Sequence, residues 1–241
     1  MEEQVADGVY RLGTRWVNWY VVRDGDRVTV IDTGLPQYSE QLASALARLD
    51  RSLEDVDAIL LTHRHYDVLG SAERLRGDSG ARVFIHPADA DIAAWRKQLR
   101  PSPVVLAHAW RPGWMVSTAH AASQGGFGLA PLTEHESLVD GDELDVPGRP
   151  RVIATPGHTP GHCAFALEER GVLLTGDALV TFDATTRSRG PRVPSINSDR
   201  AQALASLSRI ESTDAATVLP GHGAPWYGGV AEAVRRARAN A

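Results

Sequence analysis

The chain has 241 residues, enough for one sizeable hydrophobic core but little room for two. A hydrophobic fraction of 43% is typical of a soluble globular protein. The net charge of −5 argues against nucleic acid as a partner, since nucleic-acid-binding surfaces are usually basic. The single cysteine, Cys163, cannot form a disulfide within the chain, and we expect it to be a small buried apolar residue. No apolar run approaches ~18 residues and no basic, apolar leader begins the chain, so we expect a cytoplasmic protein with no membrane partner.

The first part of the chain predicts strands, followed by alternating helices and strands. Residue runs rich in β-branched and aromatic side chains predict strands at 9–12, 16–22 and 27–31, with a turn at 23–26. Apolar residues recur at helical spacing in 37–49. Four more elements follow: strands at 57–62 and 82–85, a short helix at 71–75, and a helix from Pro87 to about residue 97.

Residues 99–131 differ from the segments on either side. They contain Trp110 and Trp114 among scattered prolines and glycines, and they show no clean periodicity. We interpret this segment as a partly helical insertion, or cap, between the two halves of the chain, the alternative being a loosely patterned part of the core. The Pro112-Gly113 pair separates the two tryptophans and interrupts a simple helix, so packing is favoured over a paired substrate cage.

The second half of the chain again predicts strands and helices. The expected elements are strands at 151–154, 163–167, 171–174 and 216–219, and helices at 198–210 and 230–239. Each half therefore contains strands followed by helices, which predicts two packed sheets with helices outside. We expect one domain that spans residues 1–241.

Four phrases in the chain share one design, in which a short apolar strand ends in a turn that presents histidine or aspartate. The turns are THRHYD at 62–67, TPGH at 155–158, TGD at 175–177 and PGH at 220–222. Strand ends lie along one edge of a sheet, where loops converge and ligands commonly bind. Imidazole nitrogens and carboxylate oxygens suit zinc, and also iron or manganese. The sequence therefore predicts a metal site at a sheet edge.

The spacing within these phrases is compatible with shared coordination. His63 and His65 are two residues apart and can point the same way from an extended turn, and Asp67 follows where the chain enters a helix. A glycine, which permits a tight backbone bend, precedes each of the remaining candidates. These candidates are His158, Asp177 and His222.

The phrases, in this order, resemble those of the metallo-β-lactamase superfamily, and the strand and turn VIDTG at 30–34 fits the same pattern. The resemblance runs from about residue 16 to residue 222. It implies an α/β fold, the αβ/βα four-layer sandwich, with a metal site on its edge. It also implies roles for particular residues: His63, His65 and His158 as ligands of a first metal, Asp177 as a bridging carboxylate, Asp67 and His222 as ligands of a second metal, and Asp32 as a supporting residue.

The sequence departs from the family at Val68. The family phrase is HxHxDH, and its last histidine binds the second metal, whereas valine cannot coordinate. The second site retains Asp67, Asp177 and His222, and three protein ligands plus water can hold a metal, although more weakly. We therefore expect one well-occupied Zn²⁺ site and a weakened second one, whose oxygen-rich ligands favour manganese or iron.

A metal held by three histidines lowers the pKa of bound water and polarises a carbonyl group. The catalytic candidates beside it are Asp67 and Asp177, which can orient the water and pass a proton.

Nineteen residues follow His222 (241 − 222), too few for the helical substrate domain of glyoxalase II-like thioesterases. We therefore expect a small stand-alone hydrolase, similar to lactonases, whose partner is a small-molecule ester, lactone or thioester. Its cap should border the pocket, with Trp110 and Trp114 as candidate contacts.

Other functions remain open at this point. One is hydrolysis of a β-lactam or a phosphoester. A second is a mononuclear iron dioxygenase of the same fold, since the loss at Val68 is compatible with one-metal chemistry. A third is a non-catalytic binding protein with a degenerate metal site, against which the three intact histidines of the first site argue. The oligomeric state is also open.

Four of the remaining histidines have expected roles. His86, at a strand end, is expected to form a structural hydrogen bond, and His162 to be structural or to support a ligand. His108 and His120 lie in the cap, where a position at the solvated surface is favoured over contact with substrate. Tyr66 lies between two candidate ligands and has no assigned role.

Overall fold

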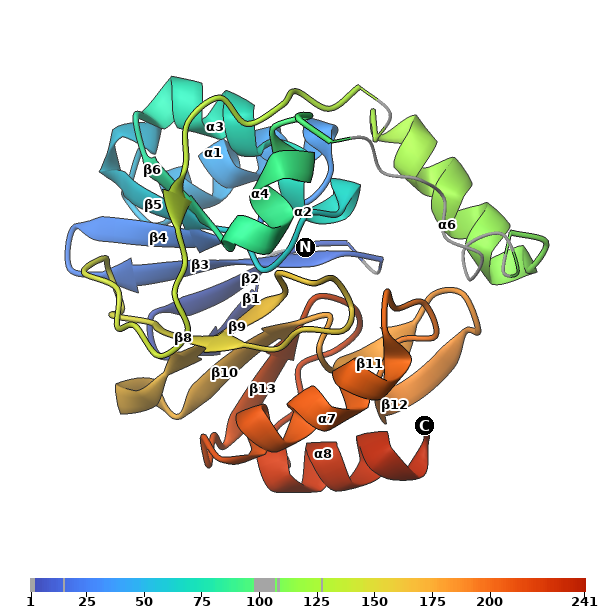
Figure 1. Cartoon of the computed structure of the whole chain (residues 1–241). Helices are drawn as coiled ribbons and strands as arrows, with labels where there is room; N and C mark the ends of the chain where they lie inside the picture. Colours follow the sequence, from blue (N-terminus) through green and yellow to red (C-terminus); the bar gives the residue numbers. More distant parts are fainter. Residues whose placement is uncertain (1–2, 15, 98–106, 108, 127) are drawn as a thin grey trace.

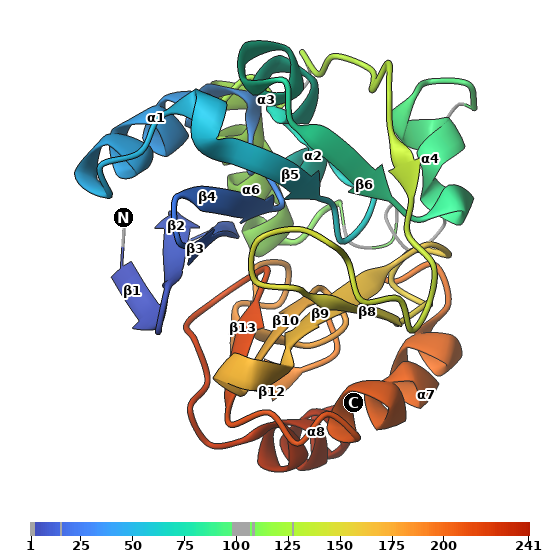
Figure 2. The same ribbon diagram turned by 90° about the vertical axis from the view of Figure 1, so that its left-hand side faces the viewer.

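Two β-sheets lie face to face, and helices cover the outer face of each (Figures 1 and 2). The computed structural model describes residues 3–14, 16–97, 107, 109–126 and 128–241. The parts of the cap at 99–106 and 127, together with His108, therefore lie outside the described residues.

The first sheet has seven strands within the described residues, in the order β1 to β7. Neighbouring strands from β1 to β4 are antiparallel, and those from β4 to β7 are parallel. Because the sheet is covered on both faces, its central strands are almost continuously apolar rather than alternating. The strands are β1 Glu3–Ala6, β2 Val9–Gly13, β3 Asn18–Asp24, β4 Arg27–Ile31, β5 Val56–Leu60, β6 Arg82–Ile85 and β7 Glu136–Ser137.

The second sheet, described by four strands, has the order β13-β10-β9-β8. Strands β10 and β13 are parallel, and β8, β9 and β10 are antiparallel neighbours. A separate antiparallel hairpin, β11–β12, follows β10 in the chain. These strands are β8 Arg151–Ala154, β9 Cys163–Leu167, β10 Val172–Gly176, β11 Val180–Asp183, β12 Ser188–Arg192 and β13 Thr217–Pro220.

The helices pack through apolar stripes spaced three and four residues apart. On α1, for example, Leu42, Ala45 and Leu46 are buried against the first sheet. Helices α7 and α8 cover the second sheet in the same way (Figure 2). The helices are α1 Ser39–Arg48, α2 Tyr66–Leu69, α3 Ala72–Ser79, α4 Pro87–Ala93, α6 Pro112–Ser123, α7 Arg200–Glu211 and α8 Val230–Ala239.

A shared core between the sheets places their edges side by side. Ile31 and Leu60 of the first sheet belong to one buried cluster with Phe165 and Leu174 of the second. The layer order, helices, sheet, sheet, helices, confirms the predicted αβ/βα four-layer sandwich. None of the helices in the described part of the chain is long and apolar enough to cross a membrane.

Most predicted elements are present, and the differences have local causes. Helix α1 begins at Ser39 rather than at residue 37, because Pro36–Tyr38 forms a 3₁₀ turn. Strands β1 and β7 and the hairpin β11–β12 were not predicted from the sequence. Strand β7 has only two residues, both exposed, and the hairpin contains Gly190 and Pro191, so neither shows clear alternation.

The cap contains helix α6, which stands apart from the other helices in Figure 1. It starts at Pro112, and its first turn lies close to the loop after β11: a Cβ on Gly113 would come within 2.3 Å of the carbonyl oxygen of Ala184. Near its other end, Ala121 belongs to the core cluster under the first sheet's helices. The helix therefore bridges the two halves of the molecule.

Candidate metal centre

Three histidine side chains converge at the edge where the two sheets meet. The Nδ1 atom of His65 lies 3.0 Å from the Nε2 atom of His63 and 3.0 Å from the Nε2 atom of His158. Among the described residues, these three form the one group of histidine, cysteine, aspartate or glutamate whose ligand atoms all lie within 4.8 Å of one another. Tetrahedral zinc with Zn–N bonds of 2.0–2.1 Å requires nitrogens about 3.3 Å apart, close to the observed spacing.

Hydrogen bonds on the far side of two rings fix which nitrogen faces the centre. The Thr62 hydroxyl donates to Asp32, so the Nδ1 of His63, 2.9 Å away, must donate to the Thr62 oxygen. The Nδ1 of His158 donates to the Oδ1 of Asn197, 3.4 Å away. The Nε2 atoms of His63 and His158 therefore both direct a lone pair at the Nδ1 of His65. A neutral His65 has at most one proton on this nitrogen, which cannot form a full hydrogen bond to both atoms. A bound cation would resolve this excess of acceptors, so the three residues fit a metal ion.

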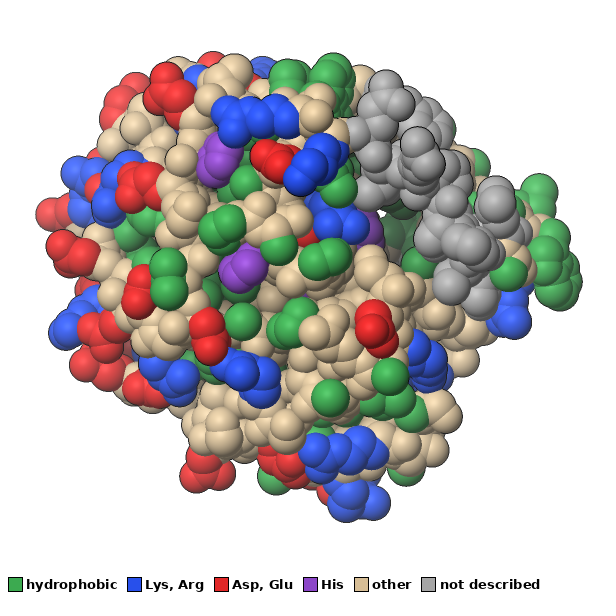
Figure 3. Space-filling model, in the orientation of Figure 1, with side chains coloured by type: hydrophobic (Ala, Val, Ile, Leu, Met, Phe, Trp, Pro, Cys, Tyr) green, Lys and Arg blue, Asp and Glu red, His purple; other side chains and the backbone are tan. Residues whose placement is uncertain are grey.

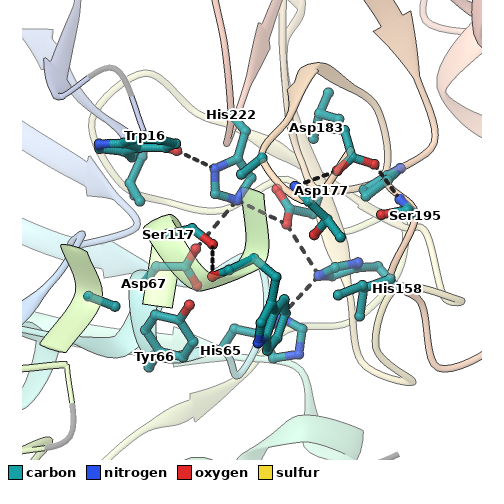
Figure 4. A pocket seen from close by; sticks show the side chains of 18 of the residues that line it. Trp16, His65, Tyr66, Asp67, Ser117, His158, Asp177, Asp183, Ser195 and His222 are labelled. Carbon is teal, nitrogen blue, oxygen red and sulfur yellow. Dashed lines mark hydrogen bonds and ion pairs between the residues drawn. The ribbon is translucent and has the colours of Figure 1, made fainter. Parts of the chain in front are cut away.

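Asp177 connects this centre to a second group of candidate ligands (Figure 4). Its Oδ2 atom lies 3.2 Å from the Nε2 of His158 and 3.3 Å from the Nε2 of His222. The Nε2 of His222 is also 3.4 Å from the Oδ2 of Asp67. The carbonyl of Trp16 accepts a hydrogen bond from the Nδ1 of His222, which aims its Nε2 at both carboxylates. The structure thus brings all six candidate ligands together.

The electrostatics of the two groups differ. Burial, with the neighbouring histidines, lowers the pKa of His65 to about 4 and that of His63 well below its usual range, so both rings are neutral near pH 7. Burial also disfavours the charged forms of Asp177 and His222, but the attraction between the negative carboxylate and the positive imidazolium outweighs the effect of burial. Without a metal, the pKa of Asp177 lies well below its usual range and that of His222 well above. His63 and His65 are ready to bind a cation, whereas His222 must lose a proton to do so.

Close contacts at two glycines determine the positions of the loops that carry His158 and His222. Gly157 has a φ of 132°, and a Cβ there would lie 2.1 Å from the backbone nitrogen of Ala203, so only glycine fits. Gly221 has no positive φ; its role is space, since a Cβ would lie 2.6 Å from the Oδ1 of Asp177. Across the sheet interface, Asn18 and Tyr20 of β3 donate hydrogen bonds to the carbonyl of Pro220.

Val68 occupies the position at which the resemblance predicts a histidine. Its side chain is buried in the core cluster under α1 to α4, and its carbonyl accepts bonds from the backbone and the hydroxyl of Thr33. Among the described residues, no second group of three meets the spacing that the first three histidines meet. Both observations agree with a weaker second site.

A cavity of ≈ 430 Å³ opens onto five of the six candidate ligands, all except His63, and Figure 3 shows the surface hollowed on the side where α6 lies. Strand β11, the loop before α7 and helix α6 form its walls, as predicted for the cap. Side chains that line it are apolar or aromatic in large part: Trp16, Val17, Leu35, Trp114, Val180, Phe182 and Ile196.

The residues of the cap differ in whether they line the cavity. Trp114 lines the cavity, but Trp110 is 72% exposed and does not, so the expectation of a contact by Trp110 is wrong. His120 also lines the cavity, which corrects the expected surface position. Its Nε2 lies 2.8 Å from the hydroxyl of Tyr38, and its ring lies 5.9 Å from that of Trp16. His108 lies outside the described residues.

Three further residues lie in defined surroundings. His86 caps α4, and its side chain accepts a hydrogen bond from the backbone of Ala88, as predicted for a structural histidine. His162 is buried, and its Nε2 accepts from the backbone nitrogen of Asp177, so it supports a ligand. Tyr66 lines the cavity beside Asp67, and burial raises the pKa of its phenol.

Sequence reasoning missed two supporting residues. Asn197 orients His158 but precedes α7 in a loop without a motif. Asp89 is fully buried at the start of α4, where it binds Arg64. An aspartate on the apolar face of a predicted helix was the available signal for Asp89.

The family profile described as "Metallo-beta-lactamase superfamily" matches residues 12–222. The chain therefore belongs to the metallo-β-lactamase superfamily. Together with the histidine cluster, this places it in a superfamily of metal-binding hydrolases.

Individual relatives agree with this assignment. The "Probable metallo-hydrolase YflN" of Bacillus subtilis is 25% identical over 93% of this chain and 87% of its own length. The crystal structure of "metallo-beta-lactamase family protein TTHA1429" from Thermus thermophilus has a TM-score of 0.71 and 30% identity, and the match covers 98% of this chain and 80% of that one. TTHA1623, solved "in a di-iron-bound form", has a TM-score of 0.63 and 27% identity over 94% of this chain and 96% of that one.

Proposed function

We propose that the protein is a metal-dependent hydrolase that cleaves a small-molecule ester, lactone or thioester. The observation that carries this proposal is the convergence of three histidines, two of which, His65 and His158, line a cavity with largely apolar walls. The name of the Bacillus subtilis relative, a probable metallo-hydrolase, supports the same class.

The chain's own residues supply the other requirements of hydrolysis. A metal ion held by His63, His65 and His158 would activate a water and polarise the scissile carbonyl. Asp67 or Asp177 would orient that water through its carboxylate and pass one proton from the water to the leaving group, since both side chains line the cavity. The aromatic walls would exclude bulk water and hold the apolar part of the substrate.

The cavity favours small substrates over polymers. A volume of ≈ 430 Å³ lies within the range of small-molecule pockets. Apolar side chains from β11 and α6 would contact an acyl chain or ring, while the polar groups gather at the metal centre. We therefore place the scissile bond at the floor and the apolar part of the substrate against Trp114 and Phe182.

The test is a hydrolysis panel with metal-loaded protein. Matched esters, lactones, thioesters, β-lactams and phosphoesters would be assayed with wild type and with His158→Ala. We expect turnover of at least one acyl substrate by wild type and none by the variant. Equal turnover by both proteins would overturn the proposal, and failure of a fully metal-loaded wild type on the whole panel would favour a binding protein.

A second candidate, a mononuclear iron dioxygenase, is favoured by the spacing of the ligands. Only the three-histidine group meets the 4.8 Å spacing among the described residues, which suits a one-metal reaction. TTHA1623, solved "in a di-iron-bound form", supports iron as the metal but with two ions rather than one. Iron content together with oxygen consumption distinguishes this candidate from a hydrolase.

A further inference from the structure

A buried aspartate outside the ligand set connects the two loops that carry the three histidines. Asp89, in the first turn of α4, has no exposed surface. Its Oδ1 accepts from the Nη1 of Arg64 at 2.6 Å and from the backbone nitrogen of Gly161 at 3.1 Å. Its Oδ2 accepts from the hydroxyl of Thr159 at 2.5 Å.

The partners of Asp89 lie next to candidate ligands in the chain. Arg64 separates His63 from His65, and Thr159 directly follows His158. One carboxylate therefore holds both loops, and a third element, α4, supports it. We propose that Asp89 is a positioning residue, which fixes the His158 loop against the His63–His65 loop so that the metal ligands are assembled before the metal arrives.

The surroundings make this connection rigid. The Arg64 side chain is only 10% exposed and Thr159 is fully buried, so water competes little for the carboxylate. A Cβ on Gly161 would come within 2.9 Å of the Asp89 carboxyl carbon, so the loop after His158 lies directly against it. Holding ligands in place before binding raises metal affinity, because less ordering remains to be done on binding.

A purely structural role for Asp89 would have a different consequence. It would lower the stability of the fold and leave the metal affinity of the folded protein unchanged. The informative quantity is therefore the affinity of the folded protein, measured well below its unfolding temperature. This inference depends on the metal-binding part of the proposed function and not on which bond is cut.

The experiment titrates Zn²⁺ into metal-free protein in competition with a chromophoric chelator. Asp89→Asn removes the charge that holds Arg64, and Thr159→Val removes one hydrogen bond at nearly constant volume. We expect each to weaken the tighter Zn²⁺ site by about 10–100-fold, the usual effect of losing a partner that orients metal ligands. Thr159→Ser, which keeps the hydroxyl, should restore most of the affinity.

Thr29→Val is the matched control for Thr159→Val. Thr29, on β4, is also fully buried, and its hydroxyl donates to the carbonyl of Pro147 at 2.9 Å; neither residue lines the cavity or belongs to a histidine loop. Its variant should keep the wild-type Zn²⁺ affinity. Wild-type affinity in folded Asp89→Asn, or in Thr159→Val if the former does not fold, would overturn the inference, as would an equal loss in Thr29→Val. A wild type that binds no Zn²⁺ would overturn this inference and the proposed function together.

Discussion

At the scale of single residues, the site depends on which ring nitrogen of each histidine already has a hydrogen-bond partner. Thr62 and Asn197 fix the inward nitrogen of His63 and His158, and Trp16 does the same for His222. Each of these partners forms its hydrogen bond from a loop, and the spacing of the sequence motifs did not indicate these bonds. The ligand candidates themselves could be predicted, since each follows a short apolar strand.

His63→Ala and His158→Ala should each abolish binding at the first metal position and, with it, hydrolysis. Each variant leaves two of three neutral nitrogen ligands, too few for a tight site. Metal content after dialysis, measured by elemental analysis, checks this result. His86→Ala is a control, since His86 caps α4, is not part of the histidine cluster and does not line the cavity. Full metal content in either site variant would refute the assignment.

Val68→His should raise the occupancy of the second position. The new imidazole would add a ligand to Asp67, Asp177 and His222, provided that the core cluster around Val68 admits the larger ring. Wild type should hold its second ion more weakly than its first and lose it first on chelation. Metal titrations of the two proteins side by side measure this. Two equally tight ions in wild type would show that the missing histidine has little effect.

At the scale of elements, the strands that end at the ligands were predictable and the cavity walls were not. Strands β5, β8, β10 and β13 have short apolar runs ended by turn residues, a local pattern that the sequence displays. The hairpin β11–β12 and helix α6 lack such patterns. Their positions depend on contacts distant in sequence, such as the approach of Gly113 to the loop after β11 and the contact of Phe182 with Trp16.

Two tryptophans near the start of α6 give a matched test of the cap. Trp114→Ala removes an aromatic wall of the cavity, and a lost contact of about 1.5 kcal/mol would raise KM roughly tenfold. Trp110→Ala changes a side chain that is 72% exposed and should keep wild-type KM. Both should keep wild-type metal content. Steady-state kinetics on the substrate found by the panel decides, and equal KM values for both variants would contradict a substrate-binding cap.

At the scale of the whole molecule, the metal site joins the two halves of the sandwich. His63 and His65 follow β5 of the first sheet, whereas His158 follows β8 of the second. The sheets also share the core cluster that contains Ile31 and Phe165. We therefore expect the single domain proposed from the sequence to unfold in one transition, with near-ultraviolet and far-ultraviolet circular dichroism changing together.

Metal removal should lower the stability of the whole molecule. A ligand that binds only the folded state, present at a hundredfold excess over its Kd, stabilises by about 2.7 kcal/mol. For a chain of this size, that corresponds to a rise in Tm of about 5–11 °C. Calorimetry of protein treated with a chelator and then reloaded with Zn²⁺ measures the difference. His63→Ala should show no such rise, and an identical Tm for loaded and stripped wild type would argue against a site between the sheets.

The most direct test of the metal centre is anomalous scattering at the absorption edge of the bound metal, combined with its stoichiometry. A crystal of the metal-loaded protein should show a fully occupied peak about 2.0–2.1 Å from the Nε2 of His63, the Nδ1 of His65 and the Nε2 of His158. A weaker peak is expected between Asp67, Asp177 and His222. An absent first peak, or a metal bound elsewhere in the molecule, would contradict the account.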